Sequence, residues 1–428
     1  MRHALRAVVL STAFAVISSF APLASADRDN DRDDDRGRHH EVRDRHRGNP
    51  AQLGDRPFYL VDGMDEGRLK NRLMQCKAGP FYQTDFSIAH RGAALQFPEH
   101  TKESYEAGAR QGAGIVECDV TFTKDGTLVC RHDECDLHTT TNIVATDLND
   151  KCSVPWTGPV PANPAPRCCA SDLSLAEFKT LTGKMDAANP AATTPQGYLG
   201  GTASWRTDLY TGRGTLLTLR ESIELNEKLG AKHTPELKSG NPVRLAEVFG
   251  GQEQYAQAMI DEFKHAGVSP RRVWAQSFNP ADVIYWVKNE PRFGRQAVYL
   301  DSINPPAVPR LSLEQLKALR KEGVQIFAPP MFALLDVAGD KVIPSQYARD
   351  IKSVGFDIIA WTFERSDLRR GAATAGFYYQ FDPKGQAVKK DSDMYKALDV
   401  LAKDVRILGI FSDWPATVTY YANCMGLK

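Results

Sequence analysis

The 428-residue sequence has no excess of charge of either sign, because 53 Lys and Arg residues balance 53 Asp and Glu residues. Proteins that bind nucleic acid carry a basic face, so we expect no nucleic acid among its partners. After Leu23 the sequence also lacks any apolar run close to the roughly 20 residues that a membrane-spanning helix needs. We therefore expect no stable membrane insertion of the mature protein.

No Cys-x-x-Cys pair occurs among the eight cysteines, which argues against a zinc site. In an oxidising compartment an even number of cysteines favours disulfides. Four cysteines lie in or beside one Pro-rich stretch, and we expect disulfides to staple it: Cys135, Cys152, Cys168 and Cys169. Cys118 and Cys130 instead fall in strand-like runs, and we expect them to be buried thiols.

The first 26 residues have the composition of a signal peptide. Arg2 and Arg6 precede an apolar run from Ala7 to Leu23, and Ala24-Ser25-Ala26 follows as an A-x-A cleavage site. The alternative is a membrane anchor, but several Ser and Thr residues and Pro22 interrupt the run. We expect residues 1–26 to be removed and the protein to be exported, to the periplasm or the extracellular space.

Residues 27–50 form a second stretch of unusual composition. They contain seven Asp, one Glu and seven Arg, and Val42 is the only branched apolar residue. A segment with so little apolar surface has nothing to bury in a core. We expect a disordered charged linker here, followed by one large domain over residues 51–428.

Short β-branched or apolar runs alternate with longer helical patterns throughout this domain. The helical patterns include Leu245–His265, Leu313–Lys321 and Ser345–Val354. Such alternation predicts a parallel sheet covered by helices, and the length suits an α/β TIM barrel, (β/α)₈. Nine strand-like runs fit eight barrel strands plus one extension: Phe86–His90, Ile115–Val120, Leu128–His132, His233–Lys238, Val273–Phe278, Gln296–Leu300, Val324–Ala328, Asp357–Phe363 and Ile407–Ser412.

The alternation is interrupted once, between His132 and His233, where Pro, Gly and Cys are frequent. A structureless loop of this length would be unusual inside a compact domain. We expect a small inserted subdomain, at about residues 134–214, between the second and third barrel strands and over one end of the barrel.

Three acidic residues fall on strand-like runs at positions where they could meet. Glu117 and Asp119 are two residues apart, so their side chains point to the same face of a strand. Glu236, on the next barrel strand after the insertion, could supply a third oxygen. An all-oxygen set selects a hard cation such as Mg²⁺ or Ca²⁺. The alternative is a set of solvated acids at strand ends.

Two histidines and two cations likewise lie at or just beyond the ends of strand-like runs. His90 and His132 each precede a turn, so both could reach one mouth of the barrel, where imidazoles can transfer protons near neutral pH. Arg91 and Lys238 lie beside these groups and suit the charge of a phosphate. Structural histidines and surface charges are the alternative interpretation.

These residues lie in a series of motifs that resembles the glycerophosphodiester phosphodiesterase family, in particular its periplasmic bacterial branch. The resemblance covers roughly Phe86 to Thr419. Its motifs are His90-Arg91-Gly92, Pro98-Glu99-His100-Thr101, Glu117-x-Asp119, Thr123-Lys124-Asp125-Gly126, His132-Asp133, Glu236-Leu237-Lys238, Gln276-Ser277-Phe278, Trp361-Thr362 and Phe411-Ser412-Asp413-Trp414-Pro415. His100 stands where many members of the family have Asn.

The resemblance implies a TIM barrel that hydrolyses a small-molecule glycerophosphodiester to glycerol 3-phosphate and an alcohol. It implies that one divalent cation is held by three carboxylates and that two histidines are the general acid and base. Since an exported enzyme meets abundant Ca²⁺, we expect Ca²⁺ to be favoured, with Mg²⁺ possible. The implied metal ligands are Glu117, Asp119 and Glu236, and the implied acid and base are His90 and His132.

The resemblance also assigns residues around the substrate. Arg91 and Lys238 match residues near the phosphate, and Trp361 matches an aromatic residue that lines the glycerol side. Glu99 and Gln276 lie in the matching motifs, and we expect them to support the site. Two alternatives are a sphingomyelinase-D-type phospholipase acting on lysophospholipids, and an inactive barrel that binds phosphorylated ligands.

Overall fold

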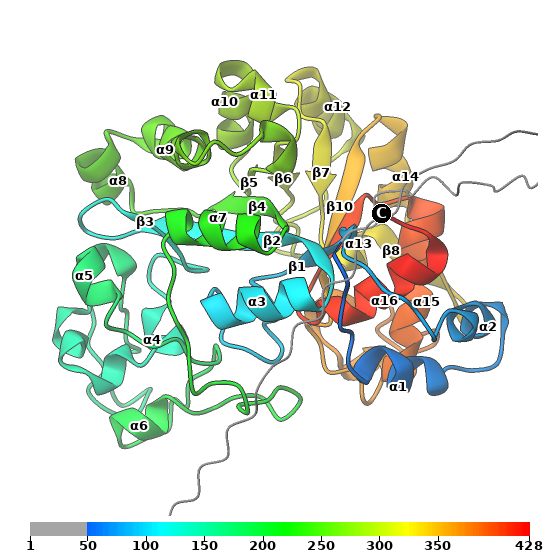
Figure 1. Ribbon diagram of the computed structural model, residues 1–428, viewed down its shortest axis with the longest axis horizontal. Helices are drawn as coiled ribbons and strands as arrows, with labels where there is room; N and C mark the ends of the chain where they lie inside the picture. The colour runs from blue at the N-terminus through cyan, green and yellow to red at the C-terminus, as the bar shows by residue number, and fades with distance from the viewer. Residues whose placement is uncertain (1–48) are drawn as a thin grey trace, which may run out of the picture. The chain divides into compact units, whose positions relative to one another are not determined.

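A closed barrel of eight parallel strands is the centre of the protein (Figure 1). The computed structural model describes residues 49–428. The predicted signal peptide and nearly all of the predicted charged linker lie outside the described residues. The barrel order is β1-β11-β10-β7-β6-β5-β4-β2, and β2 pairs with β1 to close it. The predicted TIM barrel is therefore confirmed.

Each strand-like run predicted from the sequence has its counterpart in the sheet. β3 is the extension, because it runs antiparallel to β2 outside the barrel. The strands are β1 (Thr84–Ala89), β2 (Ala113–Phe122), β3 (Leu128–Cys130), β4 (Lys232–Leu237), β5 (Gln276–Ser277), β6 (Val298–Leu300), β7 (Ile326–Ala328), β10 (Asp357–Phe363) and β11 (Gly409–Ser412), with a separate hairpin of β8 (Leu335–Ala338) and β9 (Lys341–Pro344).

The helices between the strands begin at local sequence signals. Thr218 and Ser312 each form a capping box, with Glu221 and Gln315 respectively. The helices are α1 (Arg56–Asp62), α2 (Arg68–Gln75), α3 (Lys102–Arg110), α4 (Leu137–Thr140), α5 (Leu175–Phe178), α6 (Pro195–Tyr198), α7 (Leu219–Lys228), α8 (Pro242–Phe249), α9 (Gln252–His265), α10 (Pro280–Asn289), α11 (Pro291–Gly294), α12 (Leu313–Lys321), α13 (Met331–Leu334), α14 (Gln346–Ser353), α15 (Met394–Val400) and α16 (Pro415–Met425).

The prediction of one continuous helix over Leu245–His265 is wrong. The run Leu245–His265 forms two helices, α8 and α9, rather than one. Gly250 ends α8 in the left-handed region at φ 91°, a conformation that glycine adopts readily. Gly251 follows as the N-cap of α9. The apolar periodicity continues across this Gly-Gly pair and hides the break.

The barrel interior is apolar at depth and charged at the carboxyl ends of the strands. One cluster of buried side chains comes from six different barrel strands: Ile88, Ile115, Val298, Leu300, Ile326, Ala328, Ile359 and Phe411. Glu117 and Asp119 continue the face of Ile115 along β2, because alternate residues share a face. The charged side chains therefore lie at the carboxyl end of the barrel, above the apolar cluster. TIM-barrel enzymes have their active sites at this end.

The segment between β3 and α7 has a hydrophobic cluster of its own. It contains α4, α5 and α6, which lie together beside the barrel in Figure 1. Leu137, Cys152, Cys168 and Phe178 are among the buried residues of this cluster. A core of this kind allows a long insertion to hold a fixed structure without adding a strand to the barrel.

The eight cysteines form four disulfides. Cys135–Cys169 and Cys152–Cys168 lie within the inserted segment, which confirms the prediction for these four residues. The prediction that Cys118 and Cys130 are buried thiols is wrong, because they are bonded to each other. The tight β2–β3 hairpin brings their Cα atoms to 5.2 Å. Cys76–Cys424 joins the end of α2 to α16.

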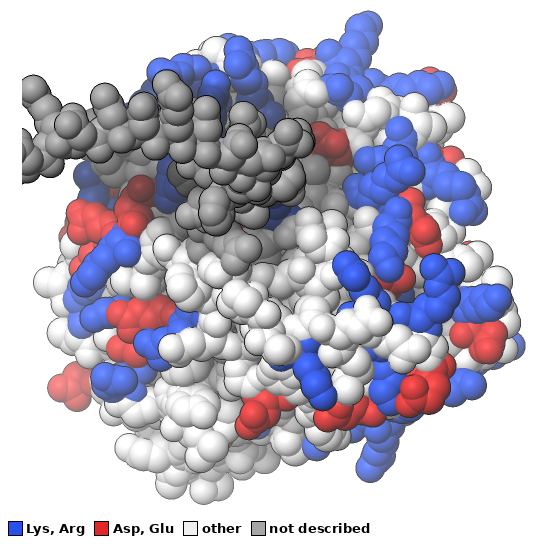
Figure 2. Space-filling view, turned by 45° about the vertical axis from the view of Figure 1, so that its right-hand side comes forward, with Lys and Arg blue, Asp and Glu red and all other residues white. Residues whose placement is uncertain are grey.

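Among residues 49–428, no helix is long and apolar enough to cross a membrane. Figure 2 shows one face of the molecule, on which Lys and Arg side chains are interspersed with Asp and Glu side chains.

We expect reduction of the disulfides to lower the melting temperature of the protein. Each native disulfide of an exported domain stabilises it by about 2–5 kcal/mol, and Cys76–Cys424 closes a loop that spans nearly the whole described chain. Thermal melts with and without reductant measure the effect. Mass mapping of the oxidised protein should find no free thiol, and eight free thiols would contradict the disulfide assignment.

Candidate active site at the carboxyl end of the barrel

Three carboxylates meet at the mouth of the barrel. Glu117 and Asp119 lie on β2 and Glu236 lies on β4, where Asp119 and Glu236 are register partners. One oxygen of each residue lies within 4.8 Å of those of the other two, and all three side chains are buried. The sheet register thus brings together the three acids predicted to meet from the sequence.

These carboxylates are buried, so their mutual repulsion is little screened by solvent. Burial, reinforced by Asp119 and Glu236, raises the pKa of Glu117 well above its ordinary value. Burial also raises the pKa of Glu236, against the opposing effect of Lys238. For Asp119 burial acts in the same direction, but Lys238 and His100 outweigh it and hold the pKa well below its usual range.

The cluster fits a divalent cation. Asp119 Oδ1 is buried without a hydrogen-bond partner among the described residues, whereas its Oδ2 accepts from His100 Nε2 at 2.8 Å. Buried polar atoms normally have partners, so this oxygen has an open coordination position. Oxygen ligands of this kind select Mg²⁺ or Ca²⁺ rather than a softer metal.

His90 is held by a carboxylate from the last barrel strand. It follows β1, and its Nδ1 lies 2.5 Å from Asp413 Oδ1. Burial lowers the pKa of His90 to about 4, despite the opposing effect of Asp413. The ring is therefore neutral at pH 7. Because an ionised carboxylate only accepts hydrogen bonds, Nδ1 carries the proton and Nε2 has a free lone pair.

His132 lies beyond β3 and lines the same cavity as His90. Its imidazole makes no hydrogen bond to another described residue, in contrast to His90. Burial, followed by the nearby charges of Arg91 and Lys238, lowers its pKa well below the ordinary value. The two predicted histidines are therefore brought together, but in different environments.

Arg91 connects several groups of the site. Its guanidinium donates to Glu99 Oε2 at 2.9 Å, and its backbone N–H donates to Glu117 Oε2 at 3.0 Å. The backbone of Arg91 has φ 57°, which is uncommon for a residue with a long side chain and is frequent at functional sites. Gln276 Nε2 donates to the other oxygen of Glu117 at 2.9 Å. Glu99 and Gln276 therefore each contact one of the predicted site residues.

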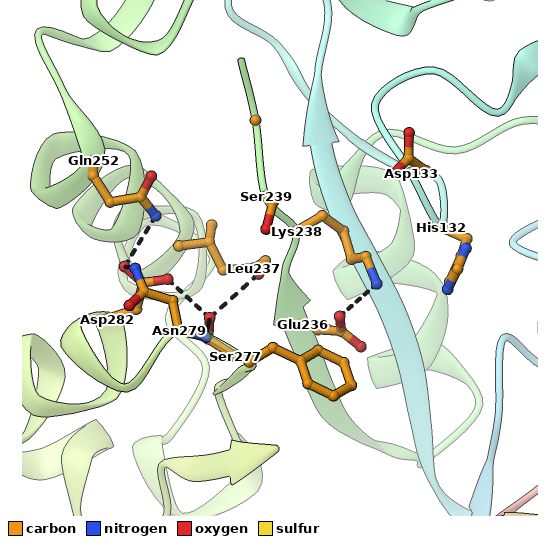
Figure 3. A pocket seen from close by; sticks show the side chains of 12 residues that line it. His132, Asp133, Glu236, Leu237, Lys238, Ser239, Gln252, Ser277, Asn279 and Asp282 are labelled. Atoms are coloured by element: carbon orange, nitrogen blue, oxygen red, sulfur yellow. Dashed lines mark hydrogen bonds and ion pairs between the residues drawn. The ribbon is translucent and has the colours of Figure 1, made fainter. Parts of the chain in front are cut away.

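Lys238 and Trp361 complete the lining. Lys238 Nζ donates to Glu236 Oε1 at 2.5 Å, and Figure 3 shows this contact beside His132. Trp361 on β10 fixes its ring by donating from Nε1 to Ala328 O at 2.8 Å. The ring stacks on Phe377 at 6.2 Å between centroids. An aromatic wall therefore faces the charged side of the barrel mouth.

Two adjoining cavities open here. The first, of about 310 Å³, is lined by both histidines, Arg91, two of the carboxylates and Trp361. The second, of about 330 Å³, extends past Lys238 toward Gln252 and Asp282 (Figure 3). Four residues line both cavities: His132, Glu236, Lys238 and Phe278.

Three further residues, for which the sequence motifs predicted no role, lie at the site. Asp413 holds His90, Arg365 donates to Asp413 Oδ2 at 2.8 Å, and His100 holds Asp119. Asp413 could have been found, because it directly follows the last strand-like run, whereas His90 ends the first. Arg365 lies in a loop after β10, and no local pattern in the sequence distinguishes it.

Known proteins resemble this chain both in sequence and in fold. "Extracellular protein" of Arthroderma benhamiae is 41% identical over 248 residues, which cover 57% of this chain and 100% of that protein. Glycerophosphodiester phosphodiesterase GDPD6 of Arabidopsis thaliana is 28% identical over 55% of this chain and 59% of its own length. A solved structure from Silicibacter pomeroyi shares the fold with a TM-score of 0.53 at 19% identity, covering 82% of this chain and 96% of that chain.

A family model covers nearly the whole barrel and all of the site residues described above. The model of the glycerophosphoryl diester phosphodiesterase family matches residues 90–416. The match begins at His90 and extends past Asp413, whose carboxylate contacts the His90 imidazole. The chain therefore belongs to the glycerophosphoryl diester phosphodiesterase family, a family of phosphodiesterases.

Proposed function

We propose that the chain hydrolyses glycerophosphodiesters to glycerol 3-phosphate and an alcohol, using one divalent cation and two histidines. The observation that carries this proposal is the meeting of three buried carboxylates and two histidines at one place, the mouth of the barrel. Family membership supports the reaction class. A binding protein would have no need of paired proton-transfer groups at such a place.

Glu117, Asp119 and Glu236 are the proposed ligands of the cation. When bound, the cation supplies Lewis-acid polarisation of a phosphoryl oxygen. Gln276 and the backbone N–H of Arg91 orient the two oxygens of Glu117, and His100 orients Asp119. We propose Ca²⁺ as the favoured ion, because carboxylates together with substrate oxygens and water suit its flexible coordination.

His90 is the proposed general base. With Nδ1–H fixed on Asp413, its Nε2 is free to accept a proton from the attacking water. The oxygen of that water forms the new P–O bond as the bond to the leaving alcohol breaks, which gives glycerol 3-phosphate. His132 is the proposed general acid that protonates the departing alkoxide, because an anionic phosphate entering the cavity raises the pKa of a nearby imidazole.

Two cations and one aromatic residue are proposed to position the substrate. Arg91 and Lys238 border the cavity and match the negative charge of the phosphate. Trp361 offers an apolar face to the glycerol carbons. Glu99 keeps the Arg91 guanidinium in place through their hydrogen bond.

We also propose that the protein is exported. The disulfides fit an oxidising compartment, and the relative in Arthroderma benhamiae is named an extracellular protein. In this proposal residues 1–26 are the signal peptide and residues 27–50 are a charged linker. The catalytic domain spans residues 51–428 and includes the insertion at about 134–214.

The proposed reaction is tested by product analysis on a panel of substrates. Glycerophosphocholine and glycerophosphoethanolamine should give glycerol 3-phosphate and the free alcohol in the presence of metal, and chelator should stop the reaction. Preferential cleavage of lysophosphatidylcholine would favour the phospholipase alternative. Phosphorylated ligands that bind without turnover would favour an inactive barrel.

We predict that Ca²⁺ activates the chelated enzyme at least as well as Mg²⁺. Mg²⁺ demands a nearly ideal octahedral arrangement, whereas Ca²⁺ accepts a less regular set of oxygens. Initial rates are measured as each ion is returned to chelator-treated enzyme. Recovery of activity with Mg²⁺ but not with Ca²⁺ would contradict the choice of ion. It would not contradict the proposal that the three carboxylates bind the metal.

Glu236→Ala should weaken metal affinity and lower activity, with partial rescue at high metal concentration, because Glu117 and Asp119 remain as ligands. Calorimetric Ca²⁺ titration beside steady-state kinetics measures both effects. Glu314→Ala, at a largely exposed helix position, controls for the loss of a carboxylate. A Glu236→Ala variant with normal metal affinity would rule out the proposed ligand.

His132→Ala should leave metal affinity nearly unchanged and lower kcat by about 10²–10⁴, the usual contribution of a positioned acid or base. His90→Ala should lose a similar factor. The two roles separate on a nitrophenyl glycerophosphodiester, because nitrophenolate leaves without a proton. The loss in His132→Ala should shrink on that substrate, and the loss in His90→Ala should persist. Equal losses on both substrates in both variants would contradict the assignment.

A further inference from the structure

A chain of hydrogen bonds and ion pairs connects the inserted segment to His90. We propose that Asp186, a residue of the insertion, is a positioning residue for His90 and acts through Arg365 and Asp413. The proposal rests on the proposed role of His90 as general base. It adds that the insertion completes the active site instead of merely covering it.

The chain consists of three consecutive contacts. Asp186 Oδ2 accepts from Arg365 Nη2 at 3.2 Å, and Arg365 Nη1 donates to Asp413 Oδ2 at 2.8 Å. The other oxygen of Asp413 accepts from His90 Nδ1 at 2.5 Å. One guanidinium therefore bridges two carboxylates, and each carboxylate comes from a different part of the fold.

The position of Asp186 is fixed by its own neighbours. Lys184 Nζ donates to the carbonyl oxygens of Met185 and Ala187, on both sides of Asp186, and to Thr139 O. Thr139 lies in α4, in the part of the insertion that the disulfides hold together. The carboxylate is thus presented from a rigid stretch of backbone.

A second arginine connects the same carboxylate to the barrel. Arg206 pairs with Asp186 Oδ1 and donates from its other terminal nitrogen to Ala94 O. Ala94 lies in the loop after β1, three residues beyond Arg91. The Arg206 side chain is only 7% exposed. The two arginines fix both oxygens of Asp186 between the insertion and the loops that carry His90 and Arg365.

The charge of Asp186 is needed to hold Arg365 where it is. Arg365 has one partner on each terminal nitrogen, and a guanidinium that loses one of two carboxylates can swing toward other acceptors. Asp413 is 1% exposed, so water does not readily replace the lost donor. Residues that orient a catalytic imidazole in this way have large effects without touching substrate.

The test uses the mature chain with Asp186→Asn, which keeps the shape of the side chain and removes its charge. We expect kcat on glycerophosphocholine to fall about tenfold, the lower end of the effect of losing an outer-shell partner. We expect KM and Ca²⁺ affinity to stay within about twofold, because Asp186 contacts neither the carboxylate cluster nor the phosphate-binding cations. Asp186→Glu should recover part of the loss.

Asp208→Asn is the matched control, because Asp208 is an exposed acid of the same insertion that accepts from Thr202 Oγ1. It should keep the wild-type kcat. In an Asp413→Asn background, Asp186→Asn should cause less than about a twofold further loss, since the chain of contacts is already broken. Additive losses in the double variant would overturn the proposal.

Two other outcomes would also overturn it. The first is an Asp186→Asn variant with wild-type kcat. The second is a fall in the kcat of Asp186→Asn that accompanies a lowered melting temperature and is equally large in Asp208→Asn. Failure of this proposal is distinguishable from failure of the proposed function. If His90→Ala keeps wild-type turnover, the general-base role fails, whereas an inactive His90→Ala beside an active Asp186→Asn contradicts only the positioning role.

Discussion

The mutual repulsion of three buried carboxylates is the constraint on which the mouth of this barrel depends. Glu117, Asp119 and Glu236 are held within 4.8 Å of one another in the protein interior, where like charges interact strongly. The surrounding residues counter this repulsion. Lys238 pairs with Glu236, Arg91 lies 3.5 Å from Asp119, and His100 donates to Asp119. The barrel supplies the rigidity, since hydrogen-bonded neighbouring strands fix the positions of the three acids.

The lowered pKa values of the two histidines follow from the same setting. Burial lowers the pKa values of His90 and His132, and the cations that balance the carboxylates act in the same direction. Burial and the cations of this site therefore both favour the neutral form of the two imidazoles. Asp413 makes the environments of the two rings different, because it contacts the imidazole of His90 and not that of His132.

The fold and the first layer of the site could be predicted from local sequence patterns. Strands in a parallel barrel are buried on both faces, so their apolar runs stand out, and Glu117 and Asp119 interrupt such a run in an obvious way. Predicting that Asp119 and Glu236 lie close together required only the order of the strands in the barrel. The helix break at Gly250 and the bond between Cys118 and Cys130 were not predicted, because the first is a property of backbone dihedrals and the second depends on the geometry of a hairpin.

The connections between distant segments could not be predicted. Arg365 and Asp186 are separated by 179 residues and lie in loops without periodicity. Only the packing of the insertion against the barrel brings them together. Roles that depend on strand register are thus visible in the sequence, whereas roles that depend on loop docking require the three-dimensional structure.

The closure of the barrel between its first and last strands has a consequence for biosynthesis. His90 and Asp413 are 323 residues apart, and β11, which precedes Asp413, is the last strand to leave the ribosome. Contacts between such distant residues form late, because a long loop must be closed first. A nascent or C-terminally truncated chain that lacks β11 has His90 without its carboxylate. Under the proposed mechanism, such a chain cannot orient His90 for proton transfer until β11 and Asp413 are in place.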